Sequence, residues 1–150
     1  MPKSYAEVYL HVVFSTKDRP PFLQDAMIRS DLFAYLGGIC HGKVDCPSIA
    51  IGGHVDHVHS LVRLGRLTAI ADLVRDLKRD SSPWLKQKGL ASFAWHRGYG
   101  AFSVSPGHVG EVVAYIAGQE EHHKKVTYQD EFRRICRKYG VQLDEEYAWD

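Results

Sequence analysis

The pair His57 and His59, separated by a single valine, has the residue types and the spacing to bind a divalent metal. Successive side chains of a β-strand point to opposite faces, so both imidazoles project from one face while Val58 points to the core. Two adjacent imidazoles on a rigid strand supply two of the three ligands of a facial metal site. The alternative interpretation is a pair of polar residues on an exposed sheet face.

A tyrosine and a glutamine four residues apart, Tyr115 and Gln119, form the second pattern. The apolar residues around them recur at i, i+3, i+4 and i+7, which predicts a helix packed through Val109, Val112, Val113 and Ile116. At about 100° per residue, Tyr115 and Gln119 lie together on a different face of that helix. The alternative interpretation is a partly buried aromatic residue beside a solvated amide.

Together, the two patterns provide metal ligands, a neutral oxygen ligand and a phenol. A phenol is a poor nucleophile at pH 7, because its pKa is about 10. It becomes useful when a neighbouring divalent cation polarises the electrophile, most naturally a phosphodiester. The chemistry that these residues favour is therefore attack by Tyr115 on a phosphodiester, which leaves a phosphotyrosine intermediate.

The elements that must position these residues follow the order β-α-β-β-α-β-α-α. The alternation of apolar and polar residues predicts strands over residues 5–15, 44–52, 57–64 and 93–105. Helical spacing predicts four helices. The first covers residues 23–41 with a break at Gly37-Gly38, and the second runs from a Thr68 N-cap to Ser81-Ser82-Pro83. The third follows Pro106 and ends at about Lys124, and the last covers residues 128–139.

The first six predicted elements match the split βαβ plan, which is the ferredoxin-like or RRM-like α+β fold. In that plan an antiparallel sheet carries its helices on one face. A C-terminal helix bearing Tyr115 is added to the plan. We expect the other face of the sheet to be free for a site.

Composition and charge narrow the class of protein. The chain has 150 residues, of which 45% are hydrophobic and 25% charged, as in an ordinary globular domain. Its apolar runs are too short to span a bilayer, so we expect no membrane association. The three cysteines are odd in number and show no CxxC spacing, which favours reduced thiols in the cytoplasm.

Local clusters of basic residues are the sequence signal for nucleic acid, because the net charge is only +1. Arg75, Lys78 and Arg79 lie on the side of their predicted helix that faces away from its apolar stripe. Lys17 follows the first predicted strand. These side chains could contact the phosphates of a nucleic acid. A solvated helix face is the alternative.

The segments DHVHSLV (56–62), GYGAFSVS (98–105) and YIAGQ (115–119) resemble those of the single-tyrosine HUH transposases of the insertion-sequence 200/605 type. This family includes relatives associated with repetitive extragenic palindromes. The beginning of the chain, HVVFSTKDRP (11–20), and its end, from QEEHHKK onwards, are similar to the same family. The resemblance covers nearly the whole chain, and it implies a single HUH transposase domain over residues 1–150.

The resemblance also implies a mechanism. Tyr115 is expected to be the nucleophile, and His57, His59 and Gln119 are expected to hold Mg²⁺ or Mn²⁺. The reaction would cleave and rejoin single-stranded DNA with hairpin ends through a 5′-phosphotyrosine intermediate. Family members work as homodimers, in which the tyrosine helix of one subunit can serve the metal site of the other.

Three other functions remain open at this point. A catalytically inactive module that binds single-stranded DNA or RNA could use the same sheet face. A metal phosphodiesterase that activates water would remain active after Tyr115→Phe. A metal-independent histidine phosphoesterase would need a third histidine in phase with the first two, and Leu61 occupies that position.

Overall fold

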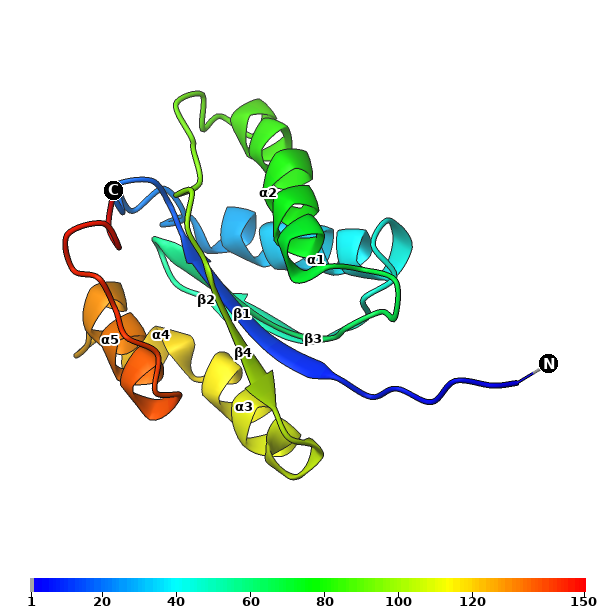
Figure 1. The fold of residues 1–150 in the computed structure, drawn as a ribbon. Helices are drawn as coiled ribbons and strands as arrows, with labels where there is room; N and C mark the ends of the chain where they lie inside the picture. The colour runs from blue at the N-terminus through cyan, green and yellow to red at the C-terminus, as the bar shows by residue number, and fades with distance from the viewer. Residues whose placement is uncertain (1) are drawn as a thin grey trace.

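The computed structural model describes residues 2–150, in which a four-stranded antiparallel sheet lies between two layers of helices (Figure 1). The strands are β1 (Tyr9–Ser15), β2 (Ser48–Gly53), β3 (His57–Arg63) and β4 (Gly100–Val104). Their order in the sheet is β2-β3-β1-β4, and each neighbouring pair is antiparallel. This is the predicted split βαβ plan, so the predicted fold class is confirmed.

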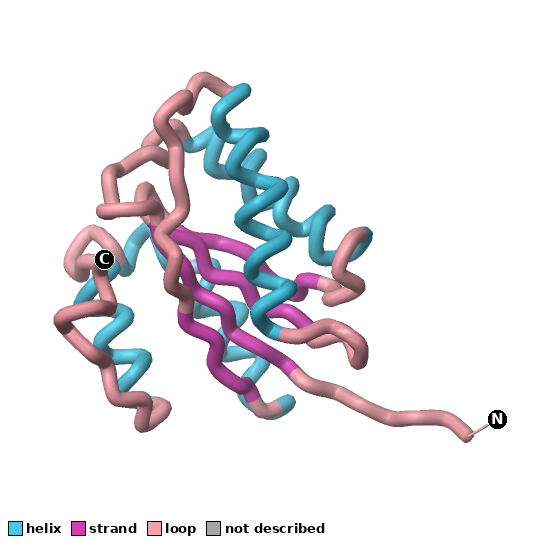
Figure 2. The backbone as a smooth tube through the Cα atoms, turned by 45° about the horizontal axis from the view of Figure 1, so that its top comes forward, coloured by secondary structure: helices cyan, strands magenta, loops and turns pink. Residues whose placement is uncertain are grey.

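Helices cover both faces of this sheet (Figures 1 and 2). One face carries α1 (Ala26–Gly42) and α2 (Ile70–Gln87). The opposite face carries a short 3₁₀ turn, η1 (Pro106–His108), followed by α3 (Val109–Ala117), α4 (Gln119–His122) and α5 (Tyr128–Lys138). The expectation that this second face is free was therefore wrong, because the C-terminal helices fold back over it.

Strand β1 shows how alternation divides the two layers. Leu10, Val12 and Phe14 are buried in the main core, beneath α1 and α2. His11 points to the opposite face, and it is also buried because α3–α5 lie there. The predicted alternation is thus confirmed over the strand itself, whereas Val8 precedes the strand and is exposed.

Helix α1 differs from its predicted form at both ends. It begins after Asp25, whose carboxylate accepts hydrogen bonds from the backbone N–H groups of Met27 and Ile28. It runs through the predicted break at Gly37-Gly38 to Gly42, because Leu36 and the buried residues that follow the glycines belong to the core. Met27, predicted on the apolar side, is 77% exposed.

Helix α2 is longer than predicted. Thr68 does not cap it, since its hydroxyl instead donates to the carbonyl of Val44 at 2.8 Å. The helix passes through Pro83 to Gln87. Trp84 stacks on Tyr35 of α1 with ring centres 4.8 Å apart, and Leu85 is fully buried. These contacts beyond the proline favour continuation of the helix.

The predicted strand 93–105 and the third predicted helix are each divided. Only Gly100–Val104 forms β4, and Trp95 makes an isolated bridge with Thr16. The helix after Pro106 breaks at Gly118 into α3 and α4. The last helix ends as predicted, just before Gly140, whose φ of +67° suits a glycine.

Within residues 2–150, no helix is both long enough and apolar enough to cross a membrane.

Candidate active site

Strand β3 brings His57 and His59 to the sheet face that α3–α5 cover, as their spacing predicts. Both imidazoles are fully buried, and their ring centres lie 5.0 Å apart. His11 of the adjacent strand β1 joins them, with its Nε2 2.7 Å from Nδ1 of His59. The paired strands thus fix three imidazoles on one rigid surface.

The break at Gly118 directs Gln119 and His123 toward this surface. Gln119 is buried, and its Oε1 lies 2.9 Å from Nε2 of His57 and 2.9 Å from Nε2 of His123. The structure therefore brings the predicted residue Gln119 to the histidine pair. It also adds His123, which lies one helical turn later.

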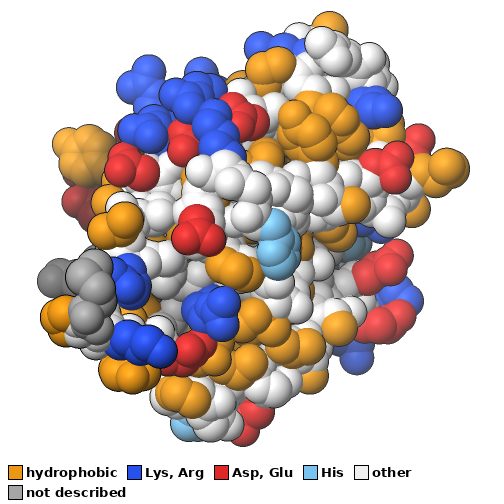
Figure 3. Space-filling view, turned by 90° about the vertical axis from the view of Figure 1, so that its right-hand side faces the viewer, with side chains coloured by type: hydrophobic (Ala, Val, Ile, Leu, Met, Phe, Trp, Pro, Cys, Tyr) orange, Lys and Arg blue, Asp and Glu red, His pale blue; other side chains and the backbone are white. Residues whose placement is uncertain are grey.

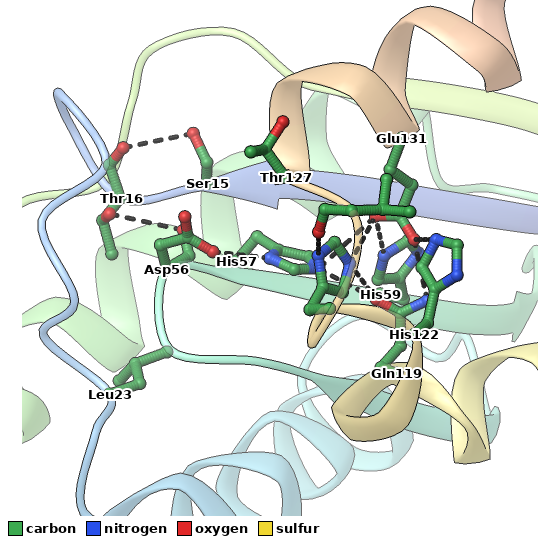
Figure 4. Close-up of polar contacts among 12 residues, drawn as sticks. Ser15, Thr16, Leu23, Asp56, His57, His59, Gln119, His122, Thr127 and Glu131 are labelled. Carbon is green, nitrogen blue, oxygen red and sulfur yellow. Dashed lines mark hydrogen bonds and ion pairs between the residues drawn. The ribbon is translucent and has the colours of Figure 1, made fainter.

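Helix α5 contributes Glu131, whose carboxylate is 1% exposed and occupies the centre of the cluster (Figure 4). Its Oε1 lies 2.9 Å from Nε2 of His59, 3.2 Å from Nε2 of His123 and 3.4 Å from Nε2 of His57. The ligand atoms of these four residues all lie within 4.8 Å of one another. Three imidazoles and one carboxylate therefore face a common point.

The Nδ1 atoms of the same three histidines are held from outside the cluster. Nδ1 of His57 lies 2.7 Å from the carboxylate of Asp56, and Nδ1 of His123 lies 2.6 Å from the carbonyl of Val126. Nδ1 of His59 faces His11. Such partners fix the orientation of histidines that ligate metals in proteins. The donor set and its outer hydrogen bonds thus fit a divalent cation.

Tyr115 of α3 is joined directly to this cluster. Its hydroxyl donates a hydrogen bond to Oε2 of Glu131, which also accepts one from Nε2 of Gln119 at 2.8 Å. Burial, followed by the contact with Glu131, raises the pKa of the Tyr115 phenol above its ordinary value. The predicted nucleophile and the predicted metal ligands therefore meet within one chain.

Burial also determines the charge states around Tyr115. It lowers the pKa of His59 to about 4 and that of His11 to about 3. Burial alone would raise the pKa of the Glu131 carboxyl, but hydrogen bonds with His123 and His59 outweigh it and lower that pKa. His59 and His11 are therefore neutral at pH 7, the form that binds metal, and Glu131 is ionised.

The predicted DNA-contacting residues lie elsewhere. Arg75, Lys78 and Arg79 belong to α2, on the opposite side of the sheet from Tyr115, and Lys17 is exposed after β1. Nζ of Lys78 donates to three backbone carbonyls of residues 96–98, and burial lowers its pKa to about 8. Figure 3 shows one face of the molecule, on which lysine and arginine side chains (blue) lie beside aspartate and glutamate side chains (red).

Two residues of the cluster, His123 and Glu131, were not among the predicted ligands. His123 follows Gln119 by four residues, so helical spacing was a usable signal for it. Glu131 lies between Tyr128 and Ile135 on the apolar side of α5, and all three are buried. A carboxylate within an apolar stripe indicates a buried partner, but the sequence does not show which partner.

The amino-acid sequence matches one protein family. The model of the family described as IS200-like transposases matches residues 4–119. A search of curated proteins finds no significant match.

Solved structures with a similar fold include a protein of Deinococcus radiodurans R1 that is provisionally described as a transposase. It is 24% identical, with a TM-score of 0.60 over 79% of this chain and 98% of the other. A REP-associated tyrosine transposase bound to a REP hairpin is 13% identical, with a TM-score of 0.60 over 84% of this chain and 74% of the other. At these identities the likeness concerns the fold. Because the family match spans most of the chain, this protein belongs to the IS200-like transposase family.

Proposed function

We propose that this chain is a metal-dependent transposase that cleaves and rejoins single-stranded DNA through a covalent bond to Tyr115. One observation carries the proposal. The Tyr115 hydroxyl is hydrogen-bonded to the carboxylate of Glu131, and that same carboxylate lies among the Nε2 atoms of three histidines. A nucleophile and a cation site that share one residue are suited to act on the same phosphate.

The residues proposed to hold the metal are His57, His59 and Glu131, with Gln119 or His123 completing the set. Imidazole and carboxylate ligands suit Mn²⁺ at least as well as Mg²⁺, which prefers oxygen ligands and retained waters. When bound, the cation would supply positive charge that polarises a phosphodiester. The Nδ1 contacts of the three histidines support this assignment, because they leave each Nε2 directed to the shared point.

In the proposed reaction, the Tyr115 oxygen attacks phosphorus and the bond from phosphorus to the 3′ oxygen breaks. The products are a 5′-phosphotyrosine and a DNA end with a free 3′-hydroxyl. The phenol loses its proton, for which its hydrogen-bond acceptor Glu131 is the nearest base, and the departing 3′ oxygen gains one. A 3′-hydroxyl that later attacks the phosphotyrosine rejoins the strands and restores the tyrosine.

The proposed substrate is single-stranded DNA with hairpin ends. The similarity in fold to a REP-associated transposase bound to a REP hairpin supports it. DNA contact by Lys17, Arg75, Lys78 and Arg79 stays a prediction, as does the homodimer. The contact between Tyr115 and Glu131 within one chain means that the proposal does not require a second subunit. A cytoplasmic location stays the expectation drawn from the three cysteines.

A covalent-adduct assay tests this proposal. Single-stranded oligonucleotides taken from the DNA that flanks the gene are labelled at the 3′ end, incubated with protein and Mn²⁺ or Mg²⁺, and run on a denaturing protein gel. We expect a labelled protein band that requires metal and is absent with double-stranded DNA. Tyr115→Phe should abolish the band. Tyr139→Phe should retain it, because Tyr139 lies on the wall of a cavity beside Tyr115 but does not contact Glu131.

Two results would contradict the proposal and favour its alternatives. Cleavage without an adduct, persisting in Tyr115→Phe, indicates a phosphodiesterase that activates water. Binding without cleavage or adduct, across several oligonucleotides and both metals, indicates an inactive binding module.

A further inference from the structure

A cavity of about 710 Å³ opens beside the Tyr115 hydroxyl, between β4, α3 and α5. Tyr115 and Glu131 form part of its wall, together with His11 and His122. The cavity therefore connects solvent with the nucleophile and with the carboxylate at the centre of the histidine cluster. Any strand that reaches Tyr115 through it must place its phosphates against the remaining wall.

Two basic residues on α5, Arg134 and Lys138, belong to that wall. They are four residues apart, so they lie one turn apart on the same side of the helix. The positive charge of Arg134 acts on Tyr115 and His122, and that of Lys138 acts on His11. The charge of Arg134 thus reaches the Tyr115 phenol, and the charge of Lys138 reaches His11 on the same cavity wall.

These two cations are also available for binding. Both side chains are exposed, and among residues 2–150 neither makes a hydrogen bond or an ion pair. Other arginines of α2 and α5 are paired with carboxylates. Arg79 lies 2.9 Å from the carboxylate of Asp76, which also binds Arg75, and Arg133 of α5 is paired with Glu145. Glu111 of α3 is an exposed acidic residue on the same cavity wall.

We infer that Arg134 and Lys138 bind the phosphates of the DNA strand next to the phosphate that Tyr115 attacks. The inference rests on the proposed function for the identity of the strand. The guanidinium of Arg134 can bind a phosphate through two hydrogen bonds, and the ammonium of Lys138 provides a mobile point charge one turn away. Both residues lie beyond the segment that the family model matches, residues 4–119. They are a contribution of this chain's C-terminal helix.

Salt-dependent binding tests this inference. The probe is a fluorescein-labelled oligothymidylate, and its affinity is measured by anisotropy over a series of salt concentrations without added metal. The variants are Arg134→Gln, Lys138→Gln and the double variant. Arg137→Gln is the matched control, because Arg137 is exposed on the same helix but does not line the cavity.

Each lost phosphate contact should reduce the salt slope by about 0.7 and weaken binding about fivefold at 0.1 M salt. The double variant should therefore bind about 25-fold more weakly, while Arg137→Gln changes little. Circular dichroism should show unchanged folding, since both residues are exposed.

The inference is overturned if the double variant retains the affinity and the salt slope of the unaltered protein. It is also overturned if Arg137→Gln weakens binding as much as Arg134→Gln does. Because binding is measured without cleavage, this result is independent of the adduct assay. If the unaltered protein forms the adduct and the double variant binds DNA as tightly as it does, only the inference is overturned. If the double variant binds DNA more weakly but the unaltered protein forms no adduct, only the proposed function is overturned.

Discussion

Glu131 joins the two halves of the site, since one of its oxygens faces three imidazoles and the other faces Tyr115 and Gln119. The apolar side of α5 brings this carboxylate into the interior. Gln119, in contrast, uses its amide N–H to hold Glu131 and its oxygen to face two histidines. The carboxylate is thus the stronger candidate for a charged metal ligand, and the amide also orients it.

Glu131→Gln should weaken Mn²⁺ binding at least tenfold, because it removes the negative charge from the cluster. Even partners that only orient a ligand contribute about 10- to 100-fold to metal affinity. Isothermal titration calorimetry measures the change. Glu120→Gln is the matched control, since that carboxylate is 71% exposed. Equal Mn²⁺ affinities for Glu131→Gln and the unaltered protein would exclude Glu131 as a ligand.

At the scale of elements, the approach of α3 to the sheet depends on Gly52 of β2. A Cβ at this position would lie 2.7 Å from the carbonyl oxygen of Ile116 and 2.8 Å from its Cγ2. A glycine therefore allows α3 to bring Tyr115, the neighbour of Ile116, over the histidine pair. No side chain fits there unless the helix moves.

Gly52→Ala should lower the free energy of unfolding by about 1–3 kcal/mol, as overpacking does. It should also reduce adduct formation, because the displaced helix carries Tyr115. Gly38→Ala is the matched control, since a Cβ there meets nothing within 4 Å and alanine favours the helix by about 1 kcal/mol. Urea unfolding of both variants measures the difference. Equal stability of the two would show that α3 does not depend on Gly52.

The sequence predicted those parts of the site that depend on neighbouring residues, and it missed those that depend on contacts between residues distant in sequence. Strand alternation fixes which face His57 and His59 share, and helical spacing places Tyr115 with Gln119, because both are local properties. Helix α5 lies against the sheet through contacts distant in sequence, so the sequence did not predict Glu131 as a ligand. Helix α2 likewise continues to Gln87, past its predicted end near Pro83, because burial of Leu85 outweighs the local preference.

For the molecule as a whole, the main hydrophobic core lies between the sheet and helices α1 and α2, on the other side of the sheet from the histidine cluster. This core contains none of the proposed metal ligands. We therefore expect protein treated with a chelator to remain folded and to unfold cooperatively. Mn²⁺ at 100 times its Kd should add about 2.7 kcal/mol, which corresponds to roughly 5–10 °C in Tm.

Thermal unfolding followed by near-ultraviolet circular dichroism checks this expectation. A chelator-treated protein that has lost its near-ultraviolet signal would show instead that the metal is needed for folding. A Tm that does not respond to Mn²⁺ would show that the folded protein does not bind the ion at this site.

As the proposed nucleophile, Tyr115 must become covalently linked to DNA through a 5′ phosphate. The most direct test is mass spectrometry of the protein after reaction with single-stranded DNA and Mn²⁺, followed by nuclease and protease digestion. We expect a nucleotide joined through its 5′ phosphate to the peptide that contains Tyr115. A nucleotide on any other residue would exclude Tyr115 as the nucleophile, as would cleaved DNA with no linked peptide.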